Sequence, residues 1–178
     1  TDNAGNKEKK NLIIAAENTS LSFTISPDAL SGKDGYIQLA DNGANAFNNN
    51  KDATQLKAER LSVKGGWNTT RSLLAFDLFC LPANTTVNSA SLTLYGNGHN
   101  PASRANDSYL YVNTSDWYES TLTWTVQPSH TTTGGIYMAA TTSSAQNTSL
   151  DVTSQVTTWV QNPSSNYGWK LMLADETT

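Results

Sequence analysis

Eight short stretches of this chain are rich in apolar residues, and in most of them apolar and polar residues alternate. Such alternation over roughly 4–8 residues is typical of β-strands that bury one face. Gly, Pro, Asn and Asp separate most of the stretches, as expected where strands end in turns. The predicted strands cover residues 21–25, 36–39, 56–63, 71–79, 87–95, 108–113, 121–126 and 168–174.

One stretch, residues 151–161, has a helical period instead. Val152, Val156, Trp159 and Val160 recur there at the spacing of one face of an α-helix. Asp151 can cap its start, and Asn162-Pro163 ends it. Many short strands with a single short helix predict an all-β fold, a jelly-roll-like β-sandwich with one short α-helix.

Residues 116–128, DWYESTLTWTVQP, carry two tryptophans seven residues apart. Burying a large apolar side chain stabilises a fold by roughly 1.5–3 kcal/mol, so Trp117 and Trp124 are predicted to pack into a core. Residues 121–126 are expected to form a strand that Pro128 ends, because proline removes a ladder donor. Glu119 is expected to be hydrogen-bonded to backbone or to neighbouring threonines rather than to act as a catalytic acid.

The composition narrows the class of protein. The chain has 178 residues, enough for one domain with a sizeable core, with 15% charged residues and a net charge of −4. This charge offers no basic surface for nucleic acid, and the sequence lacks the 18-residue apolar run of a membrane span. Cys80 is the only cysteine and is predicted to be a buried thiol. Residues 1–10 are polar and are expected to form a flexible leader at a processed N-terminus.

Asn-X-Ser/Thr sequons are frequent, which favours an extracellular or cell-surface glycoprotein. They occur at Asn18, Asn68, Asn84, Asn106, Asn113 and Asn147.

Catalytic chemistry finds little support in the residues, and the chain is not expected to be an enzyme. His99 and His130 are both predicted to lie in loops, and no serine or cysteine lies in a nucleophile elbow.

Residues 41–53, DNGANAFNNNKDA, offer hard oxygen ligands, among them Asp41, Asn42 and Asp52. Calcium accepts such ligands, so this loop is either a structural calcium site or a set of solvated turns. No cofactor is expected to be required.

Aromatic side chains are the candidates for binding a carbohydrate. Tyr109 and Tyr111 lie two residues apart on one strand face, either exposed for stacking on sugar rings or turned into the core. Trp67 follows a Gly-Gly turn and is either an exposed loop aromatic or a core residue. The cationic side chains that could pair with the carboxylates of a polysaccharide such as alginate are Lys57, Arg60, Lys64 and Arg104.

Four motifs together resemble the DNRLRE-type domain of extracellular bacterial and archaeal proteins, a family that overlaps with carbohydrate-binding modules and disaggregatase-related repeats. They are RSLLAFDLFCLPANTTVNSASLTLY, DWYESTLTWTVQP, LDVTSQVTTWV and NYGWKLMLADET, and the resemblance runs from about residue 34 to 177. The resemblance implies a non-catalytic β-sandwich, either part of a secreted enzyme or part of a surface protein.

Two departures from that family shape the functional expectation. The family continues beyond L-x-x-A-D-E-T into a last strand, whereas this chain stops at Thr178, and residues 11–25 precede the family's first strand. The division expected is therefore a leader at 1–10, a surplus strand and hinge at 11–33, and a sandwich domain at 34–178. The surplus strand is predicted to fill the vacancy in its own chain or in a neighbour. Its apolar residues are Leu12, Ile13, Ile14, Leu21, Phe23 and Ile25.

Two function classes follow. The first is a structural surface protein, a pilus-like filament subunit that self-associates head to tail by strand donation. The alternative is a carbohydrate-binding module of a secreted polysaccharide-degrading enzyme or adhesin.

Overall fold

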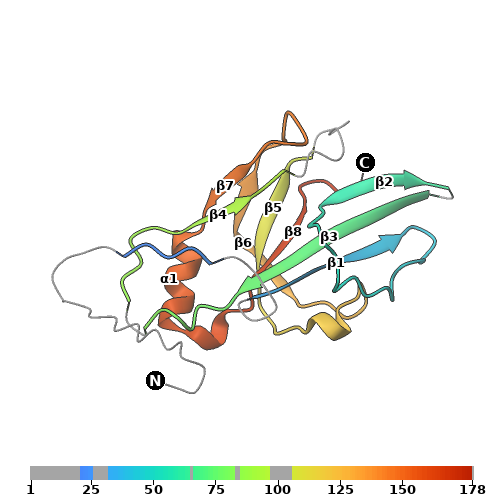
Figure 1. The fold of residues 1–178 in the computed structure, drawn as a ribbon. Coiled ribbons are helices and arrows are strands. Elements are labelled where there is room, and N and C mark those ends of the chain that lie inside the picture. The colour runs from blue at the N-terminus through green and yellow to red at the C-terminus, as the bar shows by residue number, and fades with distance from the viewer. Residues whose placement is uncertain (1–20, 26–31, 65, 83–84, 97–105, 178) are drawn as a thin grey trace, which may run out of the picture.

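The computed structural model describes residues 21–25, 32–64, 66–82, 85–96 and 106–177. These residues form an all-β sandwich with one α-helix, which confirms the predicted fold class (Figure 1). Sheet A has the order β1-β3-β8-β5-β6, with β2 also paired to β3, and sheet B consists of β4 and β7. All of the pairs are antiparallel. The strands are β1 (Gly32–Ala40), β2 (Glu59–Val63), β3 (Gly66–Phe76), β4 (Ser91–Leu94), β5 (Ser108–Asn113), β6 (His130–Met138), β7 (Thr148–Asp151) and β8 (Trp169–Leu173).

The main core lies between the inner face of sheet A and the layer formed by sheet B and α1 (Thr153–Gln161). Because successive side chains of a strand point to opposite faces, alternate residues of β3, β5 and β8 enter this core. The helix contributes Trp159, whose ring meets that of Trp169 edge to face with centroids 4.4 Å apart. The buried members are Leu74, Leu92, Leu110, Met138, Leu150, Val152, Trp159, Trp169 and Leu171.

A second, smaller core lies on the outer face of sheet A. Ile37, Leu73 and Ala75 of the sheet pack there against Trp117 and Leu122. Trp117 is 4% exposed, and its indole N–H donates to the Tyr167 carbonyl at 3.0 Å. Trp124 is partly buried against the same cluster, so the prediction that both tryptophans pack into a core is confirmed.

The prediction of a strand over residues 121–126 is wrong. This stretch begins with a short 3₁₀ turn, η1 (Glu119–Thr121), and continues without regular structure. Local bonds between Thr123 and Val126 close a turn instead of pairing with another strand. The alternation arises because residues 121–126 cover the second core without regular structure, and residues such as Leu122 point into that core. Glu119 accepts the Asp34 N–H at 2.8 Å, as its predicted structural role requires.

Other element boundaries shift, and two strands were not predicted. Regular pairing in β2 and β4 covers only part of the stretches expected at 56–63 and 87–95. β6 (HTTTGGIYM) was missed because it contains two glycines and few apolar residues, and β7 (TSLD) was missed because it is short. His130 is the first residue of β6, so its expected place in a loop is wrong, while His99 lies outside the described residues. The helix predicted over residues 151–161 is confirmed but begins at Thr153, because Asp151 is the last residue of β7 and Val152 is the N-cap. The Asp151 carboxylate still accepts the Thr153 N–H at 2.9 Å.

Two further expectations are corrected. Cys80 is exposed rather than buried, because β3 ends at Phe76 and Cys80 lies in the turn that the Leu81 N–H closes on the Leu78 carbonyl. Residues 21–25 are described but form no strand, and Leu21 and Phe23 are 60% and 55% exposed. The other predicted donor residues, Leu12, Ile13 and Ile14, lie outside the described residues. In the described part of the chain, no helix is long and apolar enough to cross a membrane.

Candidate functional site: the outer face of sheet A

Beside the second core, the outer face of sheet A carries aromatic and charged side chains from four adjacent strands. Tyr137 of β6 lies opposite Tyr109 of β5, which in turn lies opposite Met172 of β8. In a parallel row, Tyr111 of β5 lies opposite Lys170 of β8. Leu110, between the two β5 tyrosines, is 1% exposed on the core side, so strand alternation places both tyrosines on the outer face.

Three tyrosines of this face form one group, called here the tyrosine cluster (Tyr109, Tyr111 and Tyr137). The rings of Tyr109 and Tyr111 are stacked with centroids 5.2 Å apart and an interplanar angle of 11°. Tyr137 meets Tyr109 edge to face at 5.4 Å and is 53% exposed. Desolvation raises the pKa of Tyr111 and Tyr137. Tyr109 adds to the shift of Tyr111, and Asp107, whose Oδ2 accepts the Tyr137 hydroxyl at 3.5 Å, adds more than Tyr109 to the shift of Tyr137. The hydroxyls therefore stay neutral at pH 7 and can both donate and accept hydrogen bonds.

Lys170 lies beneath this face and is 1% exposed. Its ammonium donates to the Gln127 side-chain oxygen at 2.8 Å and to the Pro128 carbonyl at 2.7 Å, and its Nζ lies 3.4 Å from His130 Nδ1. Burial, together with the nearby Arg71 charge, lowers the pKa of Lys170 to about 8. Burial and the charges of Lys170 and Arg71 also lower the pKa of His130, which therefore is neutral at pH 7.

Arg71 and Glu176 occupy the middle of the face. The guanidinium donates from Nε to Oε1 at 2.9 Å and from Nη2 to Oε2 at 2.6 Å. Its Cζ also lies 4.3 Å from the ring centroid of Trp124, a cation–π arrangement. The charge of Arg71 is thus compensated within the protein.

Trp67 and Arg60 form a second group at the far end of β3. Trp67 and Arg71 are both odd-numbered residues of β3, so strand alternation places their side chains on the same, outer face. The Arg60 guanidinium lies 5.6 Å from the Trp67 ring centroid, and its Nη2 lies 3.6 Å from Asp41 Oδ1. Trp67 is neither fully exposed nor buried.

The structure brings some of the predicted glycan-binding residues together and separates others. Tyr109 and Tyr111 lie in the tyrosine cluster, whereas Trp67 and Arg60 lie at the β2 end of the same face. Lys57 belongs to neither group, because its ammonium lies 5.1 Å from the Tyr36 ring centroid and its chain segment lines the space between the sheets. Lys64 is exposed beyond β2, and Arg104 lies outside the described residues.

Sequence reasoning missed Tyr137, Lys170 and Glu176 as members of this face. Tyr137 follows two glycines in a strand that was not recognised, and Lys170 follows Trp169 in a strand dominated by apolar residues. The signal that could have found Lys170 is a charged residue at a buried position of an apolar strand, where a charge requires partners.

The predicted metal ligands have other partners. Asp41 accepts the Trp67 N–H and faces Arg60, while Asn42 accepts the Ala44 N–H. Asp52 pairs with Lys51 at 2.6 Å. Among the residues with described positions, no group of three or more His, Cys, Asp and Glu side chains could hold a metal ion. Calcium binding stays a prediction.

Two of the predicted glycosylation sites are buried in this fold. Asn113 is 1% exposed and donates to the Tyr167 carbonyl, and Asn68 is 7% exposed and accepts from Asn45. An attached glycan needs an accessible amide, which neither offers. Asn106 bonds to Thr141 on a partly buried surface, and Asn147 is exposed. Asn18 and Asn84 lie outside the described residues.

The structure thus defines the class of fold, an antiparallel β-sandwich with a group of tyrosines beside compensated charges on one sheet face. The model of carbohydrate-binding module family 96 matches residues 28–178, so the chain belongs to that family. Family membership gives the type of module, and the finer resemblance to DNRLRE-type domains stays a prediction. A search of the curated proteins finds no match to the chain.

Proposed function

We propose that this chain is a non-catalytic carbohydrate-binding module and that polysaccharide binds across the outer face of sheet A. The observation that carries the proposal is the tyrosine cluster, in which two stacked rings and a half-exposed third lie on adjacent strands. The C–H edges of a sugar ring are complementary to the negative face of an aromatic ring, while tyrosine hydroxyls bond to sugar hydroxyls.

Stacking and hydroxyl bonds, rather than net charge, are the proposed source of affinity. Arg71 is paired with Glu176, Arg60 faces Asp41, and Lys170 is buried. The face therefore offers little uncompensated charge to a polyanion. Binding that depends on stacking should change little between about 0.1 and 1 M salt, over which the Debye length falls from about 10 to 3 Å.

Isothermal titration calorimetry against a panel of neutral and carboxylated polysaccharides tests this function. Tyr137→Ala should weaken binding about tenfold or more, equivalent to about 1.4 kcal/mol. Tyr95→Ala is the matched control, because Tyr95 is 79% exposed and lines the space between the sheets instead of the outer face. If no polysaccharide in the panel binds, or if both variants bind like wild type, this assignment is wrong.

An extracellular location, in a secreted enzyme or an adhesin, is part of this proposal because polysaccharides of this kind lie outside the cell. Secretion is tested by fractionating the source cells and probing each fraction with an antibody to the chain.

A structural role is the second candidate function, in which copies of the chain assemble by donating the segment that ends at Ile25. The observation that favours it is that sheet B has only two strands in the described part of the chain and borders an open cleft. The two functions use opposite faces of sheet A, so one does not exclude the other. Electron microscopy of the purified chain tests whether it forms filaments.

A further inference from the structure

One row of side chains crosses the outer face of sheet A at right angles to its strands. Tyr109 of β5 lies opposite Tyr137 of β6 on one side and opposite Met172 of β8 on the other. Carrying the register of β8 with β3 one residue further brings Arg71 of β3 beside Met172. This line is called here the transverse row, and it consists of Tyr137, Tyr109, Met172 and Arg71.

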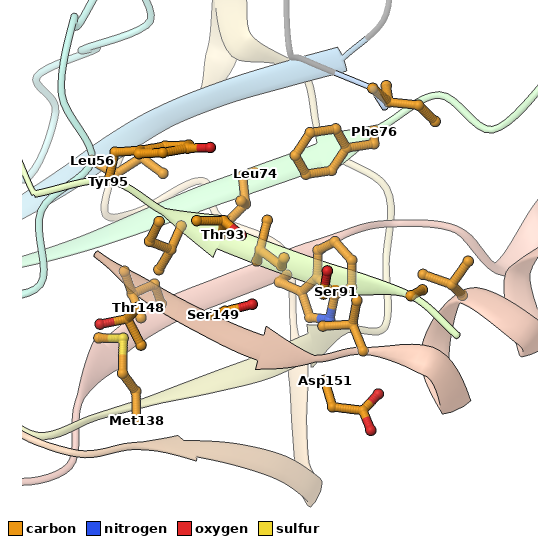
Figure 2. A pocket seen from close by; sticks show the side chains of 18 of the residues that line it. Leu56, Leu74, Phe76, Ser91, Thr93, Tyr95, Met138, Thr148, Ser149 and Asp151 are labelled. Carbon is orange, nitrogen blue, oxygen red and sulfur yellow. The ribbon is translucent and has the colours of Figure 1, made fainter. Parts of the chain in front are cut away.

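The side chains of the transverse row point away from the space between the two sheets. Figure 2 shows Leu74 of β3 and Met138 of β6 at that space, on the inner side of sheet A. Arg71 and Tyr137 lie an odd number of residues from them, so strand alternation turns both to the outer side. Tyr137 is 53% exposed and the other three members are partly exposed, so a ligand can reach the row.

The transverse row is open at one end and closed at the other. Ile37 of β1 lies opposite Arg71 and is fully buried in the second core, so the row ends at β3. Lys170 and Leu73, which lie next to the row on β8 and β3, are also buried. At the other end, β6 pairs only with β5 among the described strands. A ligand on this row would therefore enter over the edge of β6 and run toward β3.

Trp124 lies at the closed end of the row. Its ring centroid is 4.3 Å from the guanidinium carbon of Arg71, and its side chain is only partly buried against the second core. The Trp124 carbonyl accepts the Gln127 side-chain N–H at 2.7 Å, and the Gln127 oxygen in turn accepts the buried Lys170 ammonium at 2.8 Å. A ring that is held in place before binding costs little conformational entropy when a ligand stacks on it.

The ion pair of Arg71 with Glu176 lies between Trp124 and the tyrosine cluster. The two side chains are 18% and 17% exposed, so part of the pair is accessible. A guanidinium donates hydrogen bonds and a carboxylate accepts them, so the exposed part of the pair can bond to neighbouring hydroxyls of one sugar. The row thus has aromatic rings at both ends and a hydroxyl-binding group between them.

We propose that the transverse row binds an extended segment of a linear polysaccharide, with Trp124 as a second stacking site beyond the tyrosine cluster. This rests on the glycan function proposed above and adds the length of chain that is recognised. The row crosses from β6 to β3, three inter-strand spacings of about 4.8 Å, and is therefore about 14 Å long. A single sugar cannot reach from Tyr137 to Trp124, so affinity rises with chain length until Trp124 is covered.

Calorimetric titration with oligosaccharides of two lengths tests the row. The probes are the disaccharide and the hexasaccharide released by partial hydrolysis of the polysaccharide that wild type binds. Trp124→Leu, which keeps an apolar side chain against the second core, should weaken hexasaccharide binding about tenfold and disaccharide binding less than about twofold. The short probe occupies the tyrosine cluster alone, so Tyr137→Ala should weaken binding of both. Trp124→Tyr keeps a ring and should restore most of the hexasaccharide affinity.

Tyr118→Leu is the matched control. Tyr118 is an exposed ring in the segment that covers the second core, but it lies near Lys33 instead of Arg71, so this variant should bind both probes like wild type. Indole N–H signals in the NMR spectrum of isotope-labelled wild type give a readout that needs no variant. The hexasaccharide should shift the Trp124 signal, and the disaccharide should leave it in place.

The outcomes separate the row from the glycan function on which it rests. Equal effects of Trp124→Leu on the two probes would overturn the row, and so would a Trp124 signal that the hexasaccharide does not move. If Tyr137→Ala weakens binding while Trp124→Leu binds the hexasaccharide like wild type, the glycan function stands and the row is wrong. If no polysaccharide binds wild type, both are wrong.

Discussion

Arg71 and Glu176 are joined by a two-point ion pair in which the guanidinium donates to both oxygens of the carboxylate, at 2.9 and 2.6 Å. Glu176 lies three residues beyond β8, and Arg71 lies in β3, so the pair fixes the segment after β8 against the sheet. Trp124, from the cover over the second core, lies against the same guanidinium. Three segments that are distant in sequence thus meet at one side chain.

Glu176→Gln should lower the free energy of unfolding by about 1–3 kcal/mol. The substitution keeps the shape but leaves the largely buried guanidinium without its counter-charge, and both side chains are less than a fifth exposed. Urea denaturation followed by tryptophan fluorescence measures the change. Asp52→Asn is the control, since the Asp52 side chain is 84% exposed in its pair with Lys51 and should change stability by less than about 0.5 kcal/mol. Equal effects of the two substitutions would show that the Arg71–Glu176 pair adds nothing.

Gly168→Ala should destabilise the fold by more than about 3 kcal/mol. Gly168 has φ +71°, and a Cβ there would meet the Leu74 carbonyl oxygen and the Ala75 backbone. Gly43→Ala separates the two causes, because Gly43 has φ +80° but no atom within 4 Å of an added Cβ. That control should lose only about 1–2 kcal/mol, the cost of the left-handed conformation. Thermal unfolding of both variants gives the comparison, and similar losses would mean that the close approach of Gly168 to β3 has no energetic weight.

Lys170 should make the stability of the protein rise with pH above neutrality. Its pKa is about 8 when folded and 10.5 as the reference value, so between these limits the unfolded chain binds more protons. The free energy of unfolding therefore increases through this window, by an amount on the order of 1–3 kcal/mol, and is insensitive to this group below about pH 7.

The measurement for Lys170 is the difference in unfolding free energy between wild type and Lys170→Met from pH 7 to 10. Arg71, Glu176, His130 and Tyr111 surround the same ammonium and remain in both proteins, so their titrations largely cancel. Lys170→Met leaves the Gln127 and Pro128 oxygens without their donor, so it is expected to be less stable throughout. A constant difference across the range would show that Lys170 titrates near its ordinary pKa.

The sequence predicted elements whose signal is local and missed those that depend on distant neighbours. The helix over Thr153–Gln161 and the strand around Leu110 have clear periods because each buries one regular face. The strands around Leu74 and Leu171 were found by their apolar residues instead, because both of their faces are buried. Residues 121–126 show the same period as a strand, yet Leu122 points into a second core that exists only because the sheet has another apolar face. Periodicity reports burial and not hydrogen-bond pairing, so the two cases look alike in sequence.

The candidate site was predictable only where alternation applied. Tyr109 and Tyr111 share a face in any strand, and the buried Leu110 between them decides which face it is. Tyr137 enters the cluster through the pairing of β5 with β6, which bulges between Leu110 and Val112. Such a register is fixed by tertiary structure and leaves no mark in a single sequence.

Gly135 should prove necessary for the shape of the tyrosine cluster. A Cβ at this position would meet the ring of Tyr111, so Gly135→Ala must displace that ring from its stacked position on Tyr109. Because this displacement disrupts the stacking of Tyr111 on Tyr109, polysaccharide affinity should fall about tenfold, with a smaller effect on stability. Calorimetric titration of the variant with the polysaccharide that wild type binds measures the loss.

Gly134→Ala is the control for this prediction. Gly134 is the preceding residue in β6 and has φ +74°, so alanine there costs about 1–2 kcal/mol of stability, but an added Cβ has no atom within 4 Å. The control should therefore unfold more easily than wild type and still bind polysaccharide with wild-type affinity. Unchanged binding by Gly135→Ala would show that the stacked tyrosines do not recognise the polysaccharide. It would favour a glycan site near Trp67 and Arg60, at the other end of the same face.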